Sequence, residues 1–551
     1  MMEDNRRLHV ESVLNAAGSS EMRYGTAGFR GDSELMRDVM ECCGILAALR
    51  SRSENGSVIG IVITASHNPV NDNGIKIVDI DGHMLDPKWE KYLDDLVRSS
   101  NRIEVLKSIL ESNPICNDWN SPSKLYIAHD TRTSHEFLTP LLIKGAEAAN
   151  SLVVNYGLLT TPQLHWLVRF ANEHNAQPSI SDYYAQLTHC YKFWSVSISD
   201  EKEQRTLTID CANGVGWHSL AAFALELREF CSLVLKNKGD TDGVLNKECG
   251  AEHVHKKGLL PMNFQKEEAQ DEMNLCASLD GDADRLVFFY ESVQDDKDHV
   301  NSLVVIDGAK CAAIAALFCS TLAKKLDSAL SLSVGVVLTA YSNGACVEYI
   351  ESLEKVSLLM SKTGVKYLEK AAQLSDIGIY WEPNGHGSIL FSRECMQRID
   401  DFLTDSEEKE HRDEAQKLKW IAGLSNQAVG DAVSNVFLFE LLLRELQWDL
   451  ATWYSIYNEF PCEYRIVRVH DRSIVITEDF ERQVVSPIEL RTEIERVLEK
   501  YPKNSSRTFV RPSGTEDVIR VYAESASSED TRQLADEVAD LVFQLCGGIK
   551  Q

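Results

Sequence analysis

Short apolar runs alternate with longer amphipathic stretches along most of the chain. Val58–Ile63, Leu125–His129 and Leu152–Asn155 have the pattern of buried strands, and Glu136–Ala149 has the pattern of a helix between the last two. A strand, a crossover helix and a second strand make a βαβ unit, which favours a mostly parallel sheet. The first part of the chain is therefore predicted to form an α/β domain.

The same alternation begins again further along. A second unit is predicted from Leu207–Asp210 and a third from Ser302–Ile306, with further strands at Val334–Leu338 and Gly378–Trp381. The expected fold is α/β, with three successive domains of mixed or parallel sheets and a smaller C-terminal α+β domain around a central cleft. We expect these domains at residues 1–185, 186–300, 301–455 and 456–551. The elements predicted in the last one are Tyr464–His470, Ile488–Lys500, Thr508–Val510, Val518–Glu524 and Glu529–Leu545.

The composition is that of an acidic globular protein. The 551 residues are 44% hydrophobic and 25% charged, with a formal net charge of −28 and a pI of about 5.0. A broad nucleic-acid surface or an anionic membrane would need a basic stripe, and the sequence has none, so we expect neither partner. An anionic substrate must then be held by a local cluster of Arg side chains and backbone N–H groups.

The cysteines and the N-terminus indicate a cytoplasmic protein. None of the fourteen cysteines forms a Cys-x-x-Cys pair, so reduced and mostly buried thiols are favoured over disulfides. The charged start, Met1 to Arg7, has no secretory signal pattern. The longest apolar stretch, Cys311–Ala323, is too short to span a bilayer and is predicted to be a buried helix.

Four polar loops that follow predicted strands carry candidate chemistry, and the first contains Ser66. Thr64-Ala65-Ser66-His67-Asn68-Pro69 comes directly after Val58–Ile63, at the carboxyl end of a strand, where open α/β sheets bind ligands. A serine hydroxyl needs a base or a metal to become a good nucleophile. His67 is adjacent. Taken alone, this pattern is more often an ordinary turn.

The second loop, Asp280-Gly281-Asp282-Ala283-Asp284-Arg285, follows Leu275–Leu279. Three carboxylates at alternate positions can converge on one hard cation, and oxygen ligands favour Mg²⁺. Glu291 stands at the twelfth position of an EF-hand, but Arg285 replaces the glycine required at the sixth. An EF-hand is therefore disfavoured, and an acidic turn without metal is the remaining alternative.

The third and fourth loops could bind a phosphorylated polyol. Glu382-Pro383-Asn384-Gly385-His386-Gly387-Ser388 offers donors and acceptors for hydroxyls, although a polar turn is equally compatible. Arg511-Pro512-Ser513-Gly514-Thr515-Glu516, with Arg520 beyond it, combines a guanidinium, two hydroxyls and the backbone N–H groups around a glycine, which is typical of a phosphate site. It has no Walker lysine, so it is not a P-loop. A plain hairpin turn is the alternative.

These loops, in this order, resemble those of the α-D-phosphohexomutase superfamily, and within it the phosphoacetylglucosamine mutase family. The resemblance extends from Tyr24-Gly25-Thr26-Ala27-Gly28-Phe29-Arg30-Gly31 to the Arg511 loop. It implies a four-domain enzyme that converts N-acetylglucosamine 6-phosphate to the 1-phosphate, on the route to UDP-N-acetylglucosamine. It further implies a small-molecule sugar phosphate as partner, a sugar 1,6-bisphosphate as activator, and a monomer or weak dimer.

The resemblance also implies roles for single residues. Ser66 would be the phosphoserine, and Asp280, Asp282 and Asp284 would hold Mg²⁺ with the Ser66 phosphate as a further ligand. The substrate-binding residues would be Glu382, Pro383, Asn384, Ser388, Arg511, Pro512, Ser513, Gly514, Thr515 and Arg520. Pro383 stands where that family usually has Ala, and a proline has no N–H with which to contact the sugar.

The implied reaction places a large negative charge in one site. Three aspartates and a phosphate carry about −5 against +2 from the metal, so further cations are needed. Arg285, Arg30, His67 and Arg132 are candidates for this charge, although a structural salt bridge is as compatible for Arg132. Arg30 and His67 are also candidates for proton transfer, and His67 is chemically easier because an ordinary Arg does not give up its proton.

Three other functions are compatible with parts of the sequence. A phosphoglucomutase or phosphomannomutase would share the architecture and differ in the sugar. A metallophosphatase would normally need more metal ligands than one Asp triad, and it would admit water, which a mutase must exclude. A sugar-phosphate sensor would keep the Arg511 loop but would not need Ser66.

Overall fold

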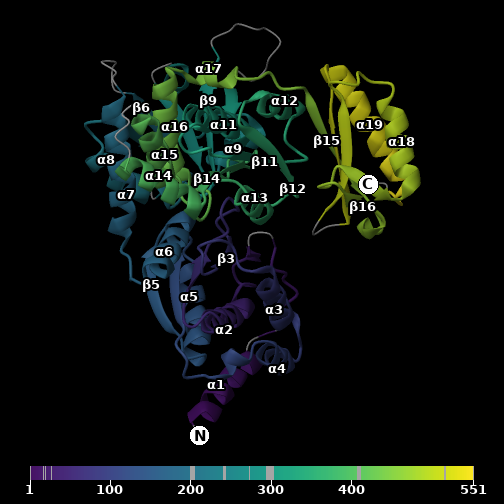
Figure 1. The fold of residues 1–551 in the computed structure, drawn as a ribbon. Coiled ribbons are helices and arrows are strands. Elements are labelled where there is room, and N and C mark those ends of the chain that lie inside the picture. Colours follow the sequence, from purple (N-terminus) through teal and green to yellow (C-terminus); the bar gives the residue numbers. More distant parts are fainter. Residues whose placement is uncertain are drawn as a thin grey trace. The chain divides into compact units, whose positions relative to one another are not determined.

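The computed structural model describes residues 2–16, 18, 20–25, 28–198, 205–239, 243–271, 274–292, 303–405, 411–513 and 517–549. They divide into two compact units, each built from strands and covering helices (Figure 1). Unit 1 comprises Met1–Gly308, Asn384–Leu390 and Gln416–Ala451, and unit 2 comprises Ala309–Pro383, Phe391–Ala415 and Thr452–Gln551.

The first sheet of unit 1 has the strand order β1-β3-β2-β4-β5. Its strands are β1 (Phe29–Asp32), β2 (Val58–Ile63), β3 (Asp72–Val78), β4 (Lys124–His129) and β5 (Leu152–Leu158). β2, β4 and β5 are parallel, whereas β3 is antiparallel to both β2 and β1. The sheet is therefore mixed, as predicted. The prediction of β5 as a buried strand is wrong, because β5 lies at the edge and Leu152 is 62% exposed.

Two helices pack closely in the core of this sheet's domain. Buried residues line almost all of α2 (Arg37–Ser53), and α5 (His135–Ala148) crosses it where two glycines meet. A Cβ atom on Gly44 would lie 2.2 Å from the Leu142 carbonyl oxygen, and one on Gly145 would lie 2.2 Å from the Glu41 carbonyl oxygen. Only glycine allows the two backbones to approach so closely.

The second sheet of unit 1 has the order β10-β9-β8-β6-β7. Its strands are β6 (Thr206–Asp210), β7 (Ser232–Lys236), β8 (Asn274–Leu279), β9 (Leu286–Glu291) and β10 (Leu303–Ile306). The prediction that β10 opens a third domain is wrong, because β10 pairs antiparallel with β9 and so extends the second sheet past residue 300. A short apolar run indicates a strand but does not identify the strand it pairs with.

Unit 2 has two parts. In the α/β part, three parallel strands lie in the order β12-β11-β13, with bounds Val334–Thr339 for β11, Val356–Ser361 for β12 and Ile377–Trp381 for β13. In the α+β part, β15 (Cys462–Arg468), β19 (Val518–Glu524) and β18 (Arg507–Pro512) form an antiparallel sheet in that order. Helices α18 (Ile488–Leu498) and α19 (Ser528–Leu545) cover one face of it, as Figure 1 shows. The predicted α+β tail is confirmed.

The remaining elements complete the chain. They are α1 (Met2–Ala16), α3 (Pro87–Arg98), α4 (Arg102–Ser112), η1 (Pro114–Asn117), α6 (Thr161–His174), α7 (Ile180–Ser197), α8 (Gly216–Glu226), α9 (Ala251–Lys257), α10 (Lys266–Gln270), α11 (Gly308–Lys325), α12 (Gly344–Ser352), α13 (Val365–Ala372), β14 (Gly387–Phe391), α14 (Arg393–Asp405), α15 (Arg412–Leu424), α16 (Ala432–Leu446), α17 (Leu450–Tyr454), η2 (Arg472–Ile474), β16 (Ile476–Glu478) and β17 (Gln483–Ser486).

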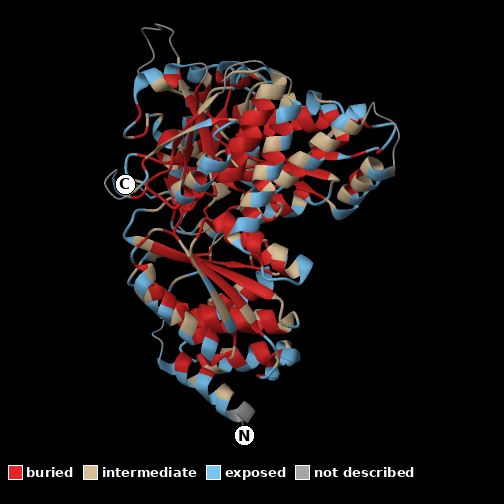
Figure 2. Cartoon of the chain, turned by 90° about the vertical axis from the view of Figure 1, so that its left-hand side faces the viewer, coloured by how far each residue is buried: buried red, intermediate tan, exposed pale blue. Residues whose placement is uncertain are grey.

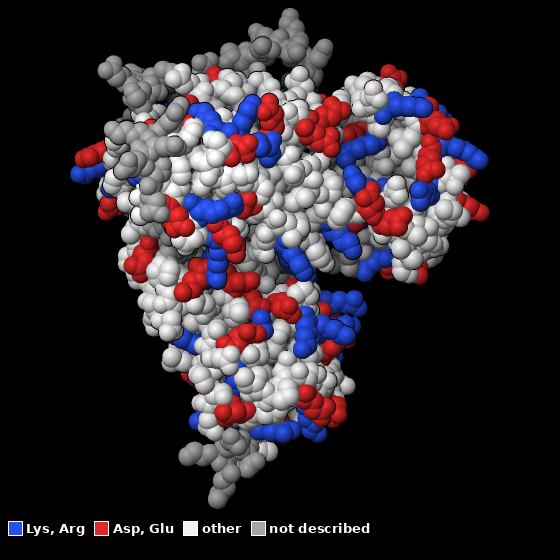
Figure 3. Space-filling view, viewed as in Figure 1, with Lys and Arg blue, Asp and Glu red and all other residues white. Residues whose placement is uncertain are grey.

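Burial confirms two predictions from composition. All fourteen cysteines are free thiols, and every one except Cys462 is buried. The predicted buried helix is α11, in which Cys311 to Ala316 are fully inaccessible. Figure 2 shows how buried residues concentrate in the strands and the helix faces packed on them. In the part of the chain that the structure describes, every helix is too short or too polar to span a lipid bilayer. On the face in Figure 3, basic and acidic side chains are interspersed.

Candidate active site

Ser66 lies in a tight turn at the carboxyl end of β2. The strand ends at Ile63, and the Ser66 N–H donates to the Thr64 hydroxyl oxygen at 2.9 Å. Ser66 has a φ of 50°, which is uncommon for a residue other than glycine. This conformation directs its hydroxyl to two groups: Oγ accepts from Arg30 at 3.1 Å and donates to Asp282 Oδ2 at 3.1 Å. The serine that sequence reasoning selected is thus joined to the predicted metal loop.

The backbone of the Ser66 turn is held by two side chains from other elements. The Arg132 guanidinium donates to the carbonyl oxygens of Ser66 and Asn68 at 3.2 and 2.8 Å. The Asn246 amide donates to the same two oxygens at 2.8 and 3.0 Å. Arg132 is itself paired with the fully buried carboxylate of Asp130. Arg132 therefore has a structural salt bridge and orients the turn.

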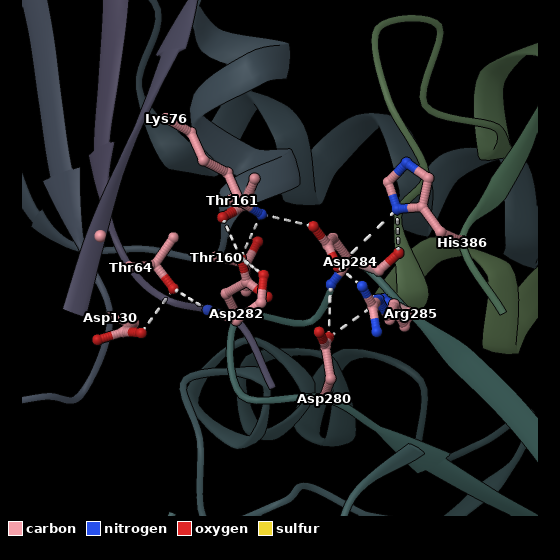
Figure 4. A network of polar contacts seen from close by, with 12 residues as sticks. Thr64, Lys76, Asp130, Thr160, Thr161, Asp280, Asp282, Asp284, Arg285 and His386 are labelled. Atoms are coloured by element: carbon pink, nitrogen blue, oxygen red, sulfur yellow. Dashed lines mark hydrogen bonds and ion pairs between the residues drawn. The ribbon is translucent and has the colours of Figure 1, made fainter. Parts of the chain in front are cut away.

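The three aspartates converge and leave room for a cation. Ligand atoms of Asp280, Asp282 and Asp284 lie within 4.8 Å of one another, and all three residues are buried (Figure 4). Each carboxylate keeps one buried oxygen without a hydrogen-bond partner, namely Asp280 Oδ2, Asp282 Oδ1 and Asp284 Oδ1. Leaving such an acceptor unsatisfied in the interior is costly, and a hard cation would satisfy all three. The donor set fits Mg²⁺.

Lys76 neutralises part of this negative charge. From β3, its Nζ donates to Asp282 Oδ2 at 2.7 Å and to Asp284 Oδ2 at 2.6 Å, with almost no exposure of the three side chains. Thr161 at the start of α6 also donates to Asp282 Oδ2, at 2.6 Å. Burial by itself lowers the pKa of Lys76, but the charges of Asp282 and Asp284 outweigh it and raise the pKa.

Arg30 and Arg285, two of the side chains expected to supply positive charge, lie beside Ser66 and Asp284 respectively. Besides contacting Ser66, Arg30 has its pKa lowered by burial and by the nearby charge of Arg285. Arg285 Nε lies 4.0 Å from Asp284 Oδ1, and Arg285 also pairs with Glu252. Burial, together with Arg285 and Arg30, lowers the pKa of His67 to about 4. His67 is therefore neutral at pH 7, and its Nδ1 is buried without a hydrogen-bond partner.

The third loop divides between the two units. Glu382 and Pro383 follow β13 in unit 2, whereas Asn384–Leu390 belong to unit 1. Asn384 Oδ1 accepts from the His386 N–H at 3.0 Å, which closes the turn. Ser388, which was expected to contact sugar, has its hydroxyl engaged within the protein. Ser388 is fully buried and its hydroxyl donates to the Asn426 carbonyl oxygen at 2.7 Å.

Gly385 and His386 attach this loop to the metal loop. Gly385 has a φ of 92°, and a Cβ atom there would lie 2.1 Å from the Leu286 carbonyl oxygen. His386 Nδ1 lies 2.8 Å from the Asp284 carbonyl oxygen, so Nδ1 must carry the proton in this bond. His386 is also 3.8 Å from Asp284 Oδ1.

The fourth loop joins β18 to β19. Arg511 and Pro512 end β18, and the Ser513 N–H donates to the Val518 carbonyl oxygen at 2.9 Å. Gly514 and Thr515 lie outside the described residues. Arg511 and Arg520 are direct cross-strand partners. Like charges in that position repel each other, and the Glu481 carboxylate, 2.7 Å from Arg511 Nε, offsets part of the repulsion. The loop therefore has two arginines on neighbouring strands that could bind an anion.

Sequence reasoning did not select four residues that this geometry brings to the serine and the metal loop. They are Lys76, Thr161, Asn246 and His386. Lys76 had a detectable signal, because a lysine between Ile75 and Ile77 in an apolar strand needs a buried anion as partner. His386 had one as well, since it lies inside the third loop. No local pattern marks Thr161 or Asn246.

Three family models match parts of the chain. "Phosphoacetylglucosamine mutase AMG1, domain III" matches residues 307–448. "Phosphoglucomutase/phosphomannomutase, C-terminal domain" matches residues 467–541, and "Phosphoglucomutase/phosphomannomutase, alpha/beta/alpha domain I" matches residues 45–104. The three matches fall within the first, third and last of the expected domains.

Full-length similarity extends to curated and solved proteins. The chain is 39% identical over 535 residues to the Homo sapiens phosphoacetylglucosamine mutase, covering 96% of this chain and 95% of that protein. It is similar to the crystal structure of Aspergillus fumigatus N-acetylphosphoglucosamine mutase with GlcNAc-6P and magnesium, with a TM-score of 0.88, 36% identity and coverage of 98% and 99%. A structure of that mutase with glucose 1,6-bisphosphate matches with a TM-score of 0.86, 35% identity and the same coverage.

Proposed function

The chain belongs to the phosphoacetylglucosamine mutase family, and from that premise we propose that it interconverts N-acetylglucosamine 6-phosphate and N-acetylglucosamine 1-phosphate. The reaction proceeds through a phosphoserine and a sugar bisphosphate, and its product feeds the formation of UDP-N-acetylglucosamine. Phospho-Ser66 donates its phosphoryl group to the free hydroxyl of the bound monophosphate. The bisphosphate then reverses its orientation in the site, and Ser66 accepts the other phosphoryl group.

One observation carries this proposal. Ser66 Oγ lies 3.1 Å from Asp282 Oδ2, beside three buried carboxylates that each keep an oxygen without a hydrogen-bond partner. A hydroxyl in that position is placed to accept a phosphoryl group beside a cation site. Phosphoryl transfer depends mainly on positioning and charge stabilisation, and both are built into this arrangement.

Asp280, Asp282 and Asp284 would hold Mg²⁺, with the Ser66 phosphate as a further ligand. The bound metal would neutralise charge that develops on the transferring group. Lys76 supplies a fixed positive charge to two of the same carboxylates. Arg30 donates to Ser66 Oγ and stabilises the oxygen that is left when the phosphoryl group departs.

We assign the movement of the hydroxyl proton to His67, because an arginine holds its proton and His67 is neutral at pH 7. Glu382 and Asn384 bind the sugar hydroxyls through their side chains, since Pro383 has no N–H to donate. Arg511, Ser513 and Arg520, with Gly514 and Thr515, bind the phosphate that is not being transferred. Sugar 1,6-bisphosphate would act as the activator that phosphorylates Ser66.

The proposed setting is the cytoplasm, because fourteen free thiols suit a reducing compartment. The partner is a small sugar phosphate, and the net charge of −28 disfavours nucleic acid and anionic membranes. We propose a monomer or weak dimer.

A coupled assay tests the function. N-acetylglucosamine 6-phosphate with a trace of sugar 1,6-bisphosphate and Mg²⁺ should yield the 1-phosphate, and no inorganic phosphate should accumulate. Preference for glucose 6-phosphate or mannose 6-phosphate over the N-acetylamino sugar would identify a phosphoglucomutase or phosphomannomutase instead. Stoichiometric phosphate release would identify a phosphatase. Binding without turnover would identify a sensor.

A further inference from the structure

Glu481 joins the candidate phosphate loop to the α/β part of unit 2. Its Oε1 accepts from Arg511 Nε at 2.7 Å, and the two side chains are 16% and 20% exposed. Its Oε2 accepts from the Thr363 hydroxyl at 2.8 Å and from the Thr363 N–H at 3.2 Å. One carboxylate oxygen of Glu481 is thus bonded to Arg511 and the other to Thr363.

The two partners of Glu481 lie at positions suited to ligand binding. Thr363 follows β12, at the carboxyl end of a parallel strand, which is where open α/β sheets bind ligands. Arg511 is the last residue but one of β18, beside the phosphate loop, and lies opposite Arg520. Glu481 itself lies in the turn between β16 and β17.

The turn that presents Glu481 has an unusual backbone. Asp479, Phe480 and Glu481 all have positive φ values, of 50°, 55° and 74°. Each such residue costs energy when it is not glycine, and it persists where the surroundings determine it. Arg482 supplies part of these surroundings through its bonds to Asp479. The pairing with Arg511 and Thr363 supplies another part.

The contact with Glu481 holds the Arg511 guanidinium through Nε. The two terminal nitrogens take no part in that hydrogen bond, so they are the donors through which Arg511 would bind an anion. Arg511 also lies near the phenol of Tyr341: burial raises the pKa of Tyr341, and the positive charge of Arg511 opposes that rise. A free arginine side chain loses much rotational freedom when it binds an anion, whereas one held in advance loses less.

We propose that Glu481 is a positioning residue that fixes the Arg511 guanidinium for binding the phosphate of a sugar phosphate. This inference rests on the proposed function of Arg511. A carboxylate beside an anion site could have the opposite effect, since it competes with phosphate for the same guanidinium. The two effects differ in sign, so measurement separates them. Positioning predicts weaker phosphate binding when the pairing is lost, and competition predicts tighter binding.

The test uses Glu481→Gln in the full-length enzyme, with Glu478→Gln as the control. Glu478 is exposed in β16, and its change removes the same charge three residues away. Calorimetry with N-acetylglucosamine 6-phosphate and unphosphorylated enzyme should show Kd raised about tenfold for Glu481→Gln and unchanged for Glu478→Gln. In steady state, KM should rise with little change in kcat, which a general loss of structure would not produce.

A double-mutant cycle with Arg511→Ala gives the decisive comparison. If Glu481 acts through Arg511, then Glu481→Gln should have almost no further effect once Arg511 is alanine. Equal effects in both backgrounds would overturn the positioning role, and so would unchanged or tighter binding by the single variant. If Arg511→Ala itself leaves binding intact, the phosphate role of Arg511 is wrong, and the positioning role is wrong with it.

Thr363→Val is a second test of the same pairing, which can be used if the Glu481→Gln variant misfolds. It removes only the hydroxyl donor to Oε2 and keeps the volume of the side chain. It should raise Kd in the same direction as Glu481→Gln, by a smaller factor. An unchanged Kd in a folded Thr363→Val protein would show that the pairing does not control Arg511.

Discussion

The hydroxyl of Ser66 donates a hydrogen bond of 3.1 Å to Oδ2 of Asp282, although 216 residues separate the two. This bond connects the carboxyl end of β2 to the turn between β8 and β9. Asp282 Oδ2 also accepts from Lys76 and Thr161, so it is fixed in place while Oδ1 has no partner. Ser66 therefore lies beside three carboxylates, and a cation would satisfy the oxygens that have no hydrogen-bond partner.

Ser66→Ala should lower mutase turnover at least ~10³-fold, because the variant lacks the hydroxyl that accepts the phosphoryl group in the proposed reaction. The fold should persist, because the Ser66 backbone bonds do not use the side chain. Intact-mass measurement should show one phosphate on the active parent and none on the variant after incubation with sugar bisphosphate. Near-normal turnover of the variant would contradict the phosphoserine.

Asp282→Asn should weaken Mg²⁺ binding by at least about tenfold at nearly constant shape. The change removes one of the three carboxylates and one anionic partner of Lys76. Calorimetric titration with Mg²⁺ measures the effect, and Asp540→Asn on the exposed face of α19 is the matched control. Full activity of the parent after exhaustive chelation would argue against the metal.

Gly281→Ala should misplace the Ser66 turn. A Cβ atom at residue 281 would lie 2.6 Å from the Ser66 carbonyl oxygen and 2.9 Å from Asn246 Nδ2, both of which belong to the contact that holds this turn. A shift of about 1 Å at a reacting group can cost ~10²-fold in rate. We expect a loss of that order in kcat with substrate Kd little changed. A normal kcat would mean that the turn adjusts without consequence.

Arg511→Ala should weaken the binding of both monophosphates, each by ~1.5–3 kcal/mol, the usual contribution of a charge-assisted hydrogen bond. The intermediate presents each end to Ser66 in turn, so one phosphate site must serve both orientations. Arg511→Lys should restore binding only in part, because an ammonium lacks the planar fork. Calorimetry of each ligand with unphosphorylated enzyme tests this, and a loss confined to one ligand would contradict a shared site.

His165 should make stability depend on pH. Burial lowers the pKa of His165 from 6.5 to about 3, so the folded protein keeps it neutral with Nδ1 bound to the Gly82 carbonyl oxygen. The unfolded chain binds a proton below about pH 6.5 and the folded chain does not. This contribution to stability is therefore complete above pH 6.5 and is lost as the pH falls toward 3.

The measurement compares the free energy of unfolding at pH 8 and pH 5. Between these two pH values, His165 should account for a loss of about 2 kcal/mol in the free energy of unfolding. The figure follows from 1.36 kcal/mol per pH unit below the unfolded pKa of about 6.5. His165→Asn, which keeps a donor near the position of Nδ1, should remove this loss. His174→Asn on the exposed end of the same helix should not. An unchanged acid loss in His165→Asn would assign the effect to other groups.

The local elements and the loops that follow them could be predicted from the amino-acid sequence. The bounds of β2 and β19 coincide with the predicted runs, Val58–Ile63 and Val518–Glu524, because a continuous or alternating apolar pattern reflects burial of the strand itself. The convergence of Asp280, Asp282 and Asp284 is also confirmed, since alternate positions in one short turn are close by covalent geometry. The roles of Glu382, Arg511 and Arg520 stay predictions.

The distant residues that complete these loops could be identified only from the tertiary structure. Lys76 reaches Asp282 across 206 positions, and Asn246 reaches Ser66 across 180. The pairing of β10 with β9, the exposure of β5 and the burial of Ser388 were decided in the same way. The periodicity of apolar residues indicates which positions are buried, but it does not indicate which surface they pack against. The partners are set by how the sheets and loops pack together, and no local pattern contains that information.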